Sequence, residues 1–250
     1  RLLLVLTVCD IRGVGPGVWN GWKGQLLRAL YRESEMMLSG DYGGAERAER
    51  IQHAQRELAE KLPDWSPERF RAYAGRHNPA YWMKVDLGHQ VQHARLVEKA
   101  EKSGDRFQVD TSTDAFRGVT ELTVMAIDHP RLLSILTGAC AAAGANIVEA
   151  QIFTTNDGFA LDSITISRAF NQDADEMRRA DRVAKHIICT LKGEVRLPDI
   201  VASRRAQTSM SQAFTVAPEV AIDNELSAKS TVVEVTGLDR AGLLYETTTE

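Results

Sequence analysis

The chain has 250 residues, of which 44% are hydrophobic and 26% charged, a balance typical of a folded protein with one large or two modest domains. A formal net charge of −4 leaves no basic surface signal, so nucleic acid is not an expected partner. The three cysteines, Cys9, Cys140 and Cys189, lack metal-type spacing and favour a reducing cytoplasm.

The first element is an apolar run from Leu2 to Cys9, which ends at Asp10. It is far shorter than the roughly 20 residues of a membrane span, so no membrane is expected as a partner. It also lacks the charged start and the cleavage site of a secretory signal. The run therefore predicts a buried helix.

The stretch up to about Gly118 is predicted to be helical, with no strand. Apolar spacing of three and four indicates a helix around Trp19 to Leu30, a charged amphipathic helix over Ala45–Leu62 and a further helix over Leu87–Lys102. His89 and His93 stand four apart and could face one metal ion, but no third ligand is suggested. Solvated histidines on a helix face are the expectation.

The pattern changes at Gly118. Alternation over 120–126 indicates a strand with one buried face, and the apolar face from Leu132 to Ala143 indicates a helix capped by Gly144. A second strand is expected from Ile147 to Thr155. The turn Asn156–Asp157–Gly158 is typical of a hairpin leading into a third strand that ends at Ser167.

The next helix is expected to begin at Asp173, with Glu176 in a capping-box position, and to end at Gly193. A polar connection then leads to a strand candidate at 214–222. The order β, α, β, β, α, β indicates an α+β fold of the ferredoxin-like type, in which two helices cover one face of an antiparallel sheet.

One segment occurs twice, as Thr120–Leu133 and as Thr231–Leu244, with every matched position 111 residues apart. In each copy a strand runs into an Asp, a tight turn and a Leu-Leu helix start. Free backbone N–H groups at such a start suit a small polar or carboxylate ligand. Asp128 could instead only cap its helix.

These turns resemble those of the ACT family of amino-acid-sensing domains, over about 118–250. The family's effector contacts map by position onto the following residues: Asp128, His129, Asn146, Asp239 and Gly242. The first turn departs from the family pattern at Arg131 and the second at Ala241. Because Arg131 could crowd a ligand, the second turn is the cleaner binding candidate.

The front of the chain sharpens the resemblance. Leu3–Arg12, followed by Gly15–Lys23, is similar to the end of the HD domain in the family of bifunctional PII uridylyltransferase/uridylyl-removing enzymes, and 81–100 is similar to the helices that follow it there. The implied domains are the HD end (1–40), a helical linker region (41–117), ACT domain 1 (118–224) and the start of ACT domain 2 (229–250).

That resemblance implies partners and cofactors. In the family a transferase domain uses UTP to uridylylate the PII signalling protein, an HD domain removes the uridylyl group with a divalent metal, Mg or Mn, and glutamine acts through the ACT domains. Asp10 takes the place of the last HD metal ligand; otherwise it is a hydrogen-bonded Asp at a helix end. ACT–ACT pairing is expected within or between chains.

With no Met before Arg1 and a second repeat cut at Glu250, the chain is expected to be an internal fragment that lacks the transferase and is inactive as a hydrolase. Two alternatives stay open. One is a non-catalytic amino-acid-binding or dimerisation module attached to another enzyme. The other is an HD phosphohydrolase under ACT control, without a transferase.

Overall fold

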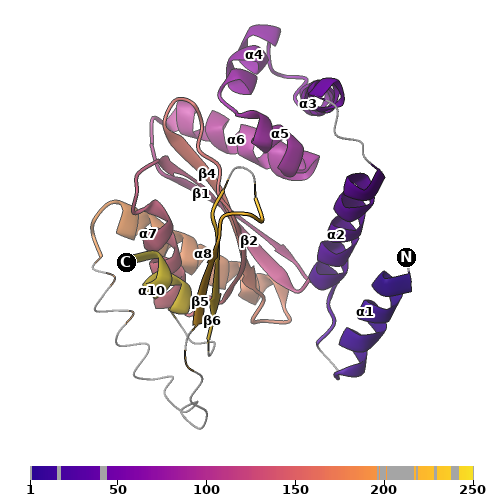
Figure 1. Cartoon of the computed structure of the whole chain (residues 1–250). Coiled ribbons are helices and arrows are strands. Elements are labelled where there is room, and N and C mark those ends of the chain that lie inside the picture. Colours follow the sequence, from indigo (N-terminus) through magenta and orange to yellow (C-terminus); the bar gives the residue numbers. More distant parts are fainter. Residues whose placement is uncertain are drawn as a thin grey trace. The chain divides into compact units, whose positions relative to one another are not determined.

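A computed structural model describes residues 2–15, 18–39, 44–195, 197, 201, 217, 219–227, 230–237 and 242–249 (Figure 1). The chain divides into two compact units. The first contains residues 1–129 and 147–188, and the second contains residues 130–146 and 189–250. The α+β class predicted from the sequence is confirmed, because helices combine with an antiparallel four-stranded sheet in the first unit.

The first unit begins with six helices: α1 (Leu2–Gly13), α2 (Gly21–Ser39), α3 (Gly44–Lys61), α4 (Pro67–Gly75), α5 (Pro79–Lys84) and α6 (Leu87–Ser103). The predicted helix at the start is confirmed, but its predicted burial is wrong. No residue of α1 is buried, and Leu2 and Leu3 are 74% and 78% exposed.

Local capping chemistry explains the short helices α4 and α5, which apolar periodicity alone did not reveal. Ser66 and Asn78 each accept a hydrogen bond from a backbone N–H in the first turn, and each precedes a proline at the first helical position. Asp86 also caps α6 by accepting a bond from the His89 backbone N–H, and Gly104 ends α6 in a left-handed conformation with φ 69°.

The sheet of the first unit has the order β1-β2-β4-β3, all neighbours antiparallel. Its strands are β1 (Gln108–Asp114), β2 (Val119–Ile127), β3 (Ile147–Gln151) and β4 (Phe159–Ser167). The prediction of an all-helical stretch before Gly118 is wrong at β1. The strand was missed because its sequence, QVDTSTD, alternates Val and Thr with polar residues and has almost no apolar signal.

β1 occupies the sheet edge beside β2, the position at which a ferredoxin-like order would place its fourth strand. The candidate for that strand, 214–222, corresponds to β5 (Glu219–Asp223), and residues 214–216 lie outside the described part of the chain. β5 pairs instead with β6 (Val232–Thr236), in a separate two-stranded sheet.

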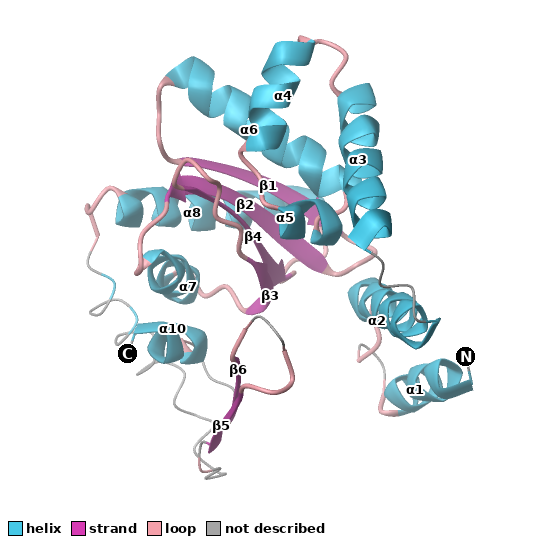
Figure 2. Ribbon diagram, turned by 45° about the horizontal axis from the view of Figure 1, so that its top comes forward, coloured by secondary structure: helices cyan, strands magenta, loops and turns pink. Residues whose placement is uncertain are grey.

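The four-stranded sheet is covered on both faces, so the predicted single buried face is wrong (Figure 2). Eight of the nine β2 residues are buried. On one face, His93 of α6 contacts the Ser163 hydroxyl of β4 at 3.1 Å. On the other, Glu176 of α8 (Asp173–Leu191) accepts a hydrogen bond from the Thr120 hydroxyl of β2 at 2.7 Å.

Glu176 does not form the predicted capping box with Asp173. Its fully buried carboxylate accepts bonds from the backbone N–H groups of Ala169 and Phe170, both at 3.0 Å, and from Arg179 at 2.7 Å. These donors lower the pKa of Glu176 against the effect of burial. The residue therefore ties the β4–α8 connection to the sheet.

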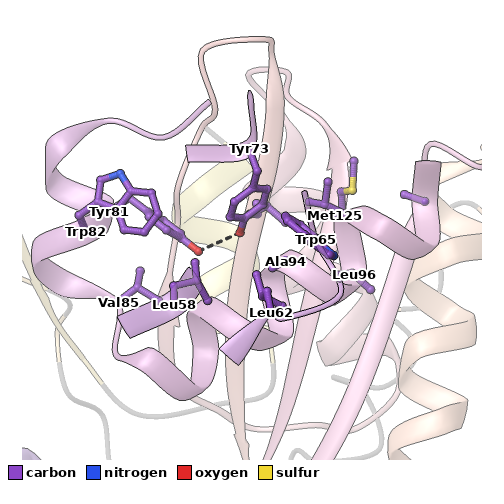
Figure 3. Close-up of a cluster of buried hydrophobic side chains, with 13 residues drawn as sticks. Leu58, Leu62, Trp65, Tyr73, Tyr81, Trp82, Val85, Ala94, Leu96 and Met125 are labelled. Atoms are coloured by element: carbon purple, nitrogen blue, oxygen red, sulfur yellow. Dashed lines mark hydrogen bonds between the residues drawn. The ribbon is translucent and has the colours of Figure 1, made fainter. Parts of the chain in front are cut away.

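A hydrophobic core cluster lies where α3 to α6 meet the sheet (Figure 3). It joins aromatic and aliphatic side chains of these helices to Met125 of β2 and Leu161 of β4. Polar atoms inside it form a chain, with Tyr73 Oη 3.3 Å from Tyr81 Oη and Tyr81 Oη 3.0 Å from His93 Nδ1. This packing joins α3 to α6 to the sheet.

The second unit contains α7 (Leu132–Ala142), β5, β6 and α10 (Leu243–Thr249). Gly144, with φ 71°, follows α7 as predicted. α7 and α10 pack closely: the hydroxyls of Thr137 and Thr248 lie 3.2 Å apart. A Cβ added to Gly138 would lie only 2.7 Å from the Tyr245 ring, so Gly138 permits this approach.

Candidate functional site

Asp128 lies directly after β2, at a corner where that strand meets the β3–β4 hairpin. Its backbone N–H donates to the Gly158 carbonyl at 3.0 Å, and its carboxylate accepts a bond from the Thr154 hydroxyl at 3.2 Å. The N-cap of α7 is Arg131, which makes no side-chain cap bond. The alternative that Asp128 only caps this helix stays a prediction.

A second carboxylate, Asp162 of β4, belongs to the same corner. Its side chain is 1% exposed and accepts a bond from the Phe153 backbone N–H at 3.3 Å. Burial raises the pKa of Asp162 to about 7, and the nearby negative charge of Asp128 adds to this effect. No sequence pattern pointed to Asp162, because an Asp within a strand is identified as buried only once both sheet faces are known.

The predicted hairpin turn is confirmed and is held by α4. The Asn156 backbone N–H donates to the Arg76 carbonyl at 2.8 Å, and the Arg76 guanidinium pairs with Asp157 at 2.6 Å. Gly158 has φ 81°, a conformation in which a side chain is strained. This anchoring fixes the loop that carries Thr154 beside Asp128.

The other residues predicted for the first turn are solvent-accessible. His129 follows Asp128 at the surface, and Asn146 is exposed in the connection between α7 and β3. Both lie in the described part of the chain, but their role as effector contacts stays a prediction.

In the second copy of the repeat, Gly242 begins the turn into α10, with φ 84°. A Cβ added there would lie 3.0 Å from the Val201 side chain, so both the conformation and the space require glycine. Asp239 lies outside the described residues. Thr137 and Thr248 are themselves 111 residues apart, so the helices of the two copies meet at equivalent positions.

Asp10, the predicted metal ligand, is exposed on α1. Within the described ranges, no three or more His, Cys, Asp or Glu side chains form a group that could hold a metal ion. One carboxylate does not make a metal site, so the Asp10 assignment stays a prediction.

His89 and His93 are not the solvated histidines expected from the sequence. Both face the sheet from α6. His93 is 1% exposed, and burial lowers its pKa to about 3. His89 is held between Asp86 and Glu121, with its Nε2 2.5 Å from Glu121 Oε1. Because both of its imidazole nitrogens contact these carboxylates, His89 does not share a metal ion with His93.

Comparison with known proteins gives relatives that match 99–100% of the chain. It is 54% identical over 249 residues to a bifunctional uridylyltransferase/uridylyl-removing enzyme of Bradyrhizobium sp. (strain ORS 278), covering 100% of this chain. Proteins with the same name from Nitrobacter hamburgensis and Rhodopseudomonas palustris are each 52% identical, covering 99% and 100% of the chain. No protein-family model matches the chain.

The chain spans 27% of the length of these curated relatives. Among the described helices, none combines the length and the hydropathy needed to cross a membrane. The resemblance to the bifunctional uridylyltransferase/uridylyl-removing enzymes is thereby confirmed: over its whole length the chain corresponds to a region of these enzymes.

Proposed function

We propose that this chain is the regulatory, glutamine-sensing region of a bifunctional enzyme that uridylylates and deuridylylates the nitrogen-signalling protein PII. The observation that carries the proposal is the match over 99–100% of this chain, at 52–54% identity, to enzymes with that bifunctional name. The whole enzyme would use UTP and a divalent metal, Mg or Mn, in domains outside this chain. It would act in the cytoplasm.

The Asp128 corner supports the sensing role. Two carboxylates, Asp128 and the buried Asp162, lie close enough for the charge of one to raise the pKa of the other. An ammonium group beside them would favour the charged form of both. The Thr154 hydroxyl donates to Asp128, and its oxygen can accept a hydrogen bond from the same ammonium group. An amino acid offers such an ammonium group.

The contact between the repeat helices supports a second element of the proposal. α7 and α10 meet through Thr137 and Thr248, the same position of the two copies. We therefore propose that the two ACT units pair within one chain, with Gly242 in the turn of the second copy.

Titration calorimetry of the chain with glutamine, and with asparagine and glutamate as comparisons, tests the sensing role. Glutamine is expected to bind measurably more tightly than either. Asp128→Asn is expected to weaken binding, while Asp175→Asn, a change at a surface helix position, is expected to leave it unchanged. Preferential binding of another amino acid would overturn the glutamine assignment.

A further inference from the structure

A cleft of about 460 Å³ opens in the first unit, away from the Asp128 corner, between the start of α6 and the β1–β2 hairpin. Six charged or amide side chains line it: Asp86, His89, Gln92, Asp114, Arg117 and Glu121. Its volume is within the range of small-molecule sites. The start of α2 also contacts this hairpin, because the Gly21 backbone N–H donates to the Phe116 carbonyl at 3.3 Å.

Two buried polar atoms of the cleft residues have neither a hydrogen-bond nor an ion-pair partner within the described part of the chain. They are Nε of Arg117 and Oε1 of Gln92. The Arg117 side chain has only a long ion pair with Glu121, through Nη1 at 3.9 Å. A buried donor or acceptor without a partner destabilises the folded chain, so such atoms call for a ligand or water. The Arg117 Nε is a donor of a cationic group, and the Gln92 Oε1 is a neutral acceptor.

The charges of the cleft select the kind of ligand. The carboxylates of Asp86 and Glu121 both contact His89, and these contacts raise its pKa to about 10, so the imidazolium is charged at neutral pH. Asp114 accepts a bond from the Arg117 backbone N–H at 2.9 Å. Three carboxylates against two cations leave one net negative charge. A dianion such as phosphate would be repelled, whereas a zwitterion adds no net charge.

We propose that this cleft is a second binding site, for the zwitterionic backbone of a free amino acid, with its carboxylate on Arg117 and its ammonium group on Gln92 and Asp114. The Arg117 guanidinium offers a planar pair of donors that matches a carboxylate. His89 holds Glu121 and Asp86 in place, which leaves Arg117 free for the ligand. The choice of an amino acid among zwitterions rests on the proposed function.

Calorimetry of the chain with a panel of amino acids that includes glutamine tests the site. Arg117→Gln is expected to weaken the binding of at least one amino acid roughly 10- to 100-fold, and Gln92→Met roughly 3- to 10-fold. Arg71→Gln, at a side chain that is 74% exposed, is the matched control and is expected to change nothing. Circular dichroism and the thermal midpoint verify that each variant is folded.

The outcomes separate this inference from the proposed function. If glutamine binding is lost in Asp128→Asn and kept in Arg117→Gln and Gln92→Met, the cleft inference is overturned and the sensing proposal stands. If another amino acid binds in an Arg117-dependent way and glutamine does not, the cleft stands and the glutamine assignment fails. If no amino acid binds the unmodified chain, the cleft holds water only and the inference is wrong.

Discussion

His89 illustrates, at the residue scale, how surroundings decide the role of a side chain. From the sequence it is one of two histidines four apart on a helix. In the structure it is a charged link from the start of α6 to β2, because Asp86 and Glu121 both stabilise its imidazolium and raise its pKa to about 10. His93, one turn later, meets Tyr81 and Ser163 and is neutral.

We predict that His89→Gln destabilises the chain by on the order of 2 kcal/mol near pH 6, since solvent reaches a quarter of the side chain and weakens the pairs. A histidine whose pKa is raised in the folded chain stabilises the fold fully at pH values below its unfolded pKa of about 6.5. This stabilisation is lost as the pH rises through the pKa of the folded chain. The difference in unfolding free energy should therefore shrink from pH 6.5 to pH 10, as measured by urea unfolding.

The matched control for this prediction is His53→Gln on α3, where His53 is 66% exposed and pairs with Glu57 in the next turn. Its effect should stay below about 0.5 kcal/mol at every pH. A constant difference between wild type and His89→Gln across this pH range would contradict the charged link.

At the scale of elements, backbone conformation explains the glycine at the hairpin, and lack of space explains the glycine at the helix contact. Gly158, in the β3–β4 turn, has φ 81°, and the space that a Cβ would take there is open. Gly138, inside α7, has ordinary helical geometry but no space, because Tyr245 and Leu197 lie within 2.8 Å of where its Cβ would be. The same residue type is therefore required for two different reasons.

Gly158→Ala should cost about 1 kcal/mol of stability, since only the left-handed backbone opposes the new side chain. Gly75→Ala is the control: Gly75 ends α4 with open space and no positive φ, so alanine should be neutral or stabilising there. Thermal unfolding of both variants measures the difference. Equal loss in the two variants would show that the turn conformation of Gly158 is not the cause.

Gly138→Ala should separate α10 from α7, because its methyl group would overlap the Tyr245 ring. Hydrogen exchange of the amides in 243–249 should become faster, while exchange in β2 and β4 should hardly change. Tyr245→Ala should remove much of the added effect of Gly138→Ala, a non-additivity typical of residues in contact. Additive effects of the two substitutions would contradict this contact.

At the scale of the whole molecule, the buried titratable groups of the first unit set how stability depends on pH. Burial lowers the pKa of His77 to about 4 and of His93 to about 3, and raises that of Asp162 to about 7. Below pH 6.5 the two histidines therefore bind two protons in the unfolded chain that they do not bind in the folded chain. Asp162 has the opposite effect, because it binds one proton in the folded chain that it does not bind in the unfolded chain.

The unfolding free energy should therefore fall on acidification from pH 6.5 to pH 5, by up to about 1.4 kcal/mol per pH unit, since one net proton favours the unfolded state. Asp162→Asn removes the opposing contribution and should make this fall up to about twofold steeper. Urea unfolding at several pH values between 5 and 6.5 measures both slopes. An unchanged slope in Asp162→Asn would refute the raised pKa.

Local patterns of spacing, turn residues and motifs were enough to predict the α+β class, the two copies of the strand–turn–helix segment and the family. The fold was needed to show that β1 lies beside β2, that α6 covers the second face of the sheet, and that His89, Arg117 and Gln92 share a cleft. These features were hidden because a polar strand and a polar helix face look solvent-exposed in sequence. Their partners, such as Glu121 and Ser163, are distant along the chain and become neighbours only when the sheet forms.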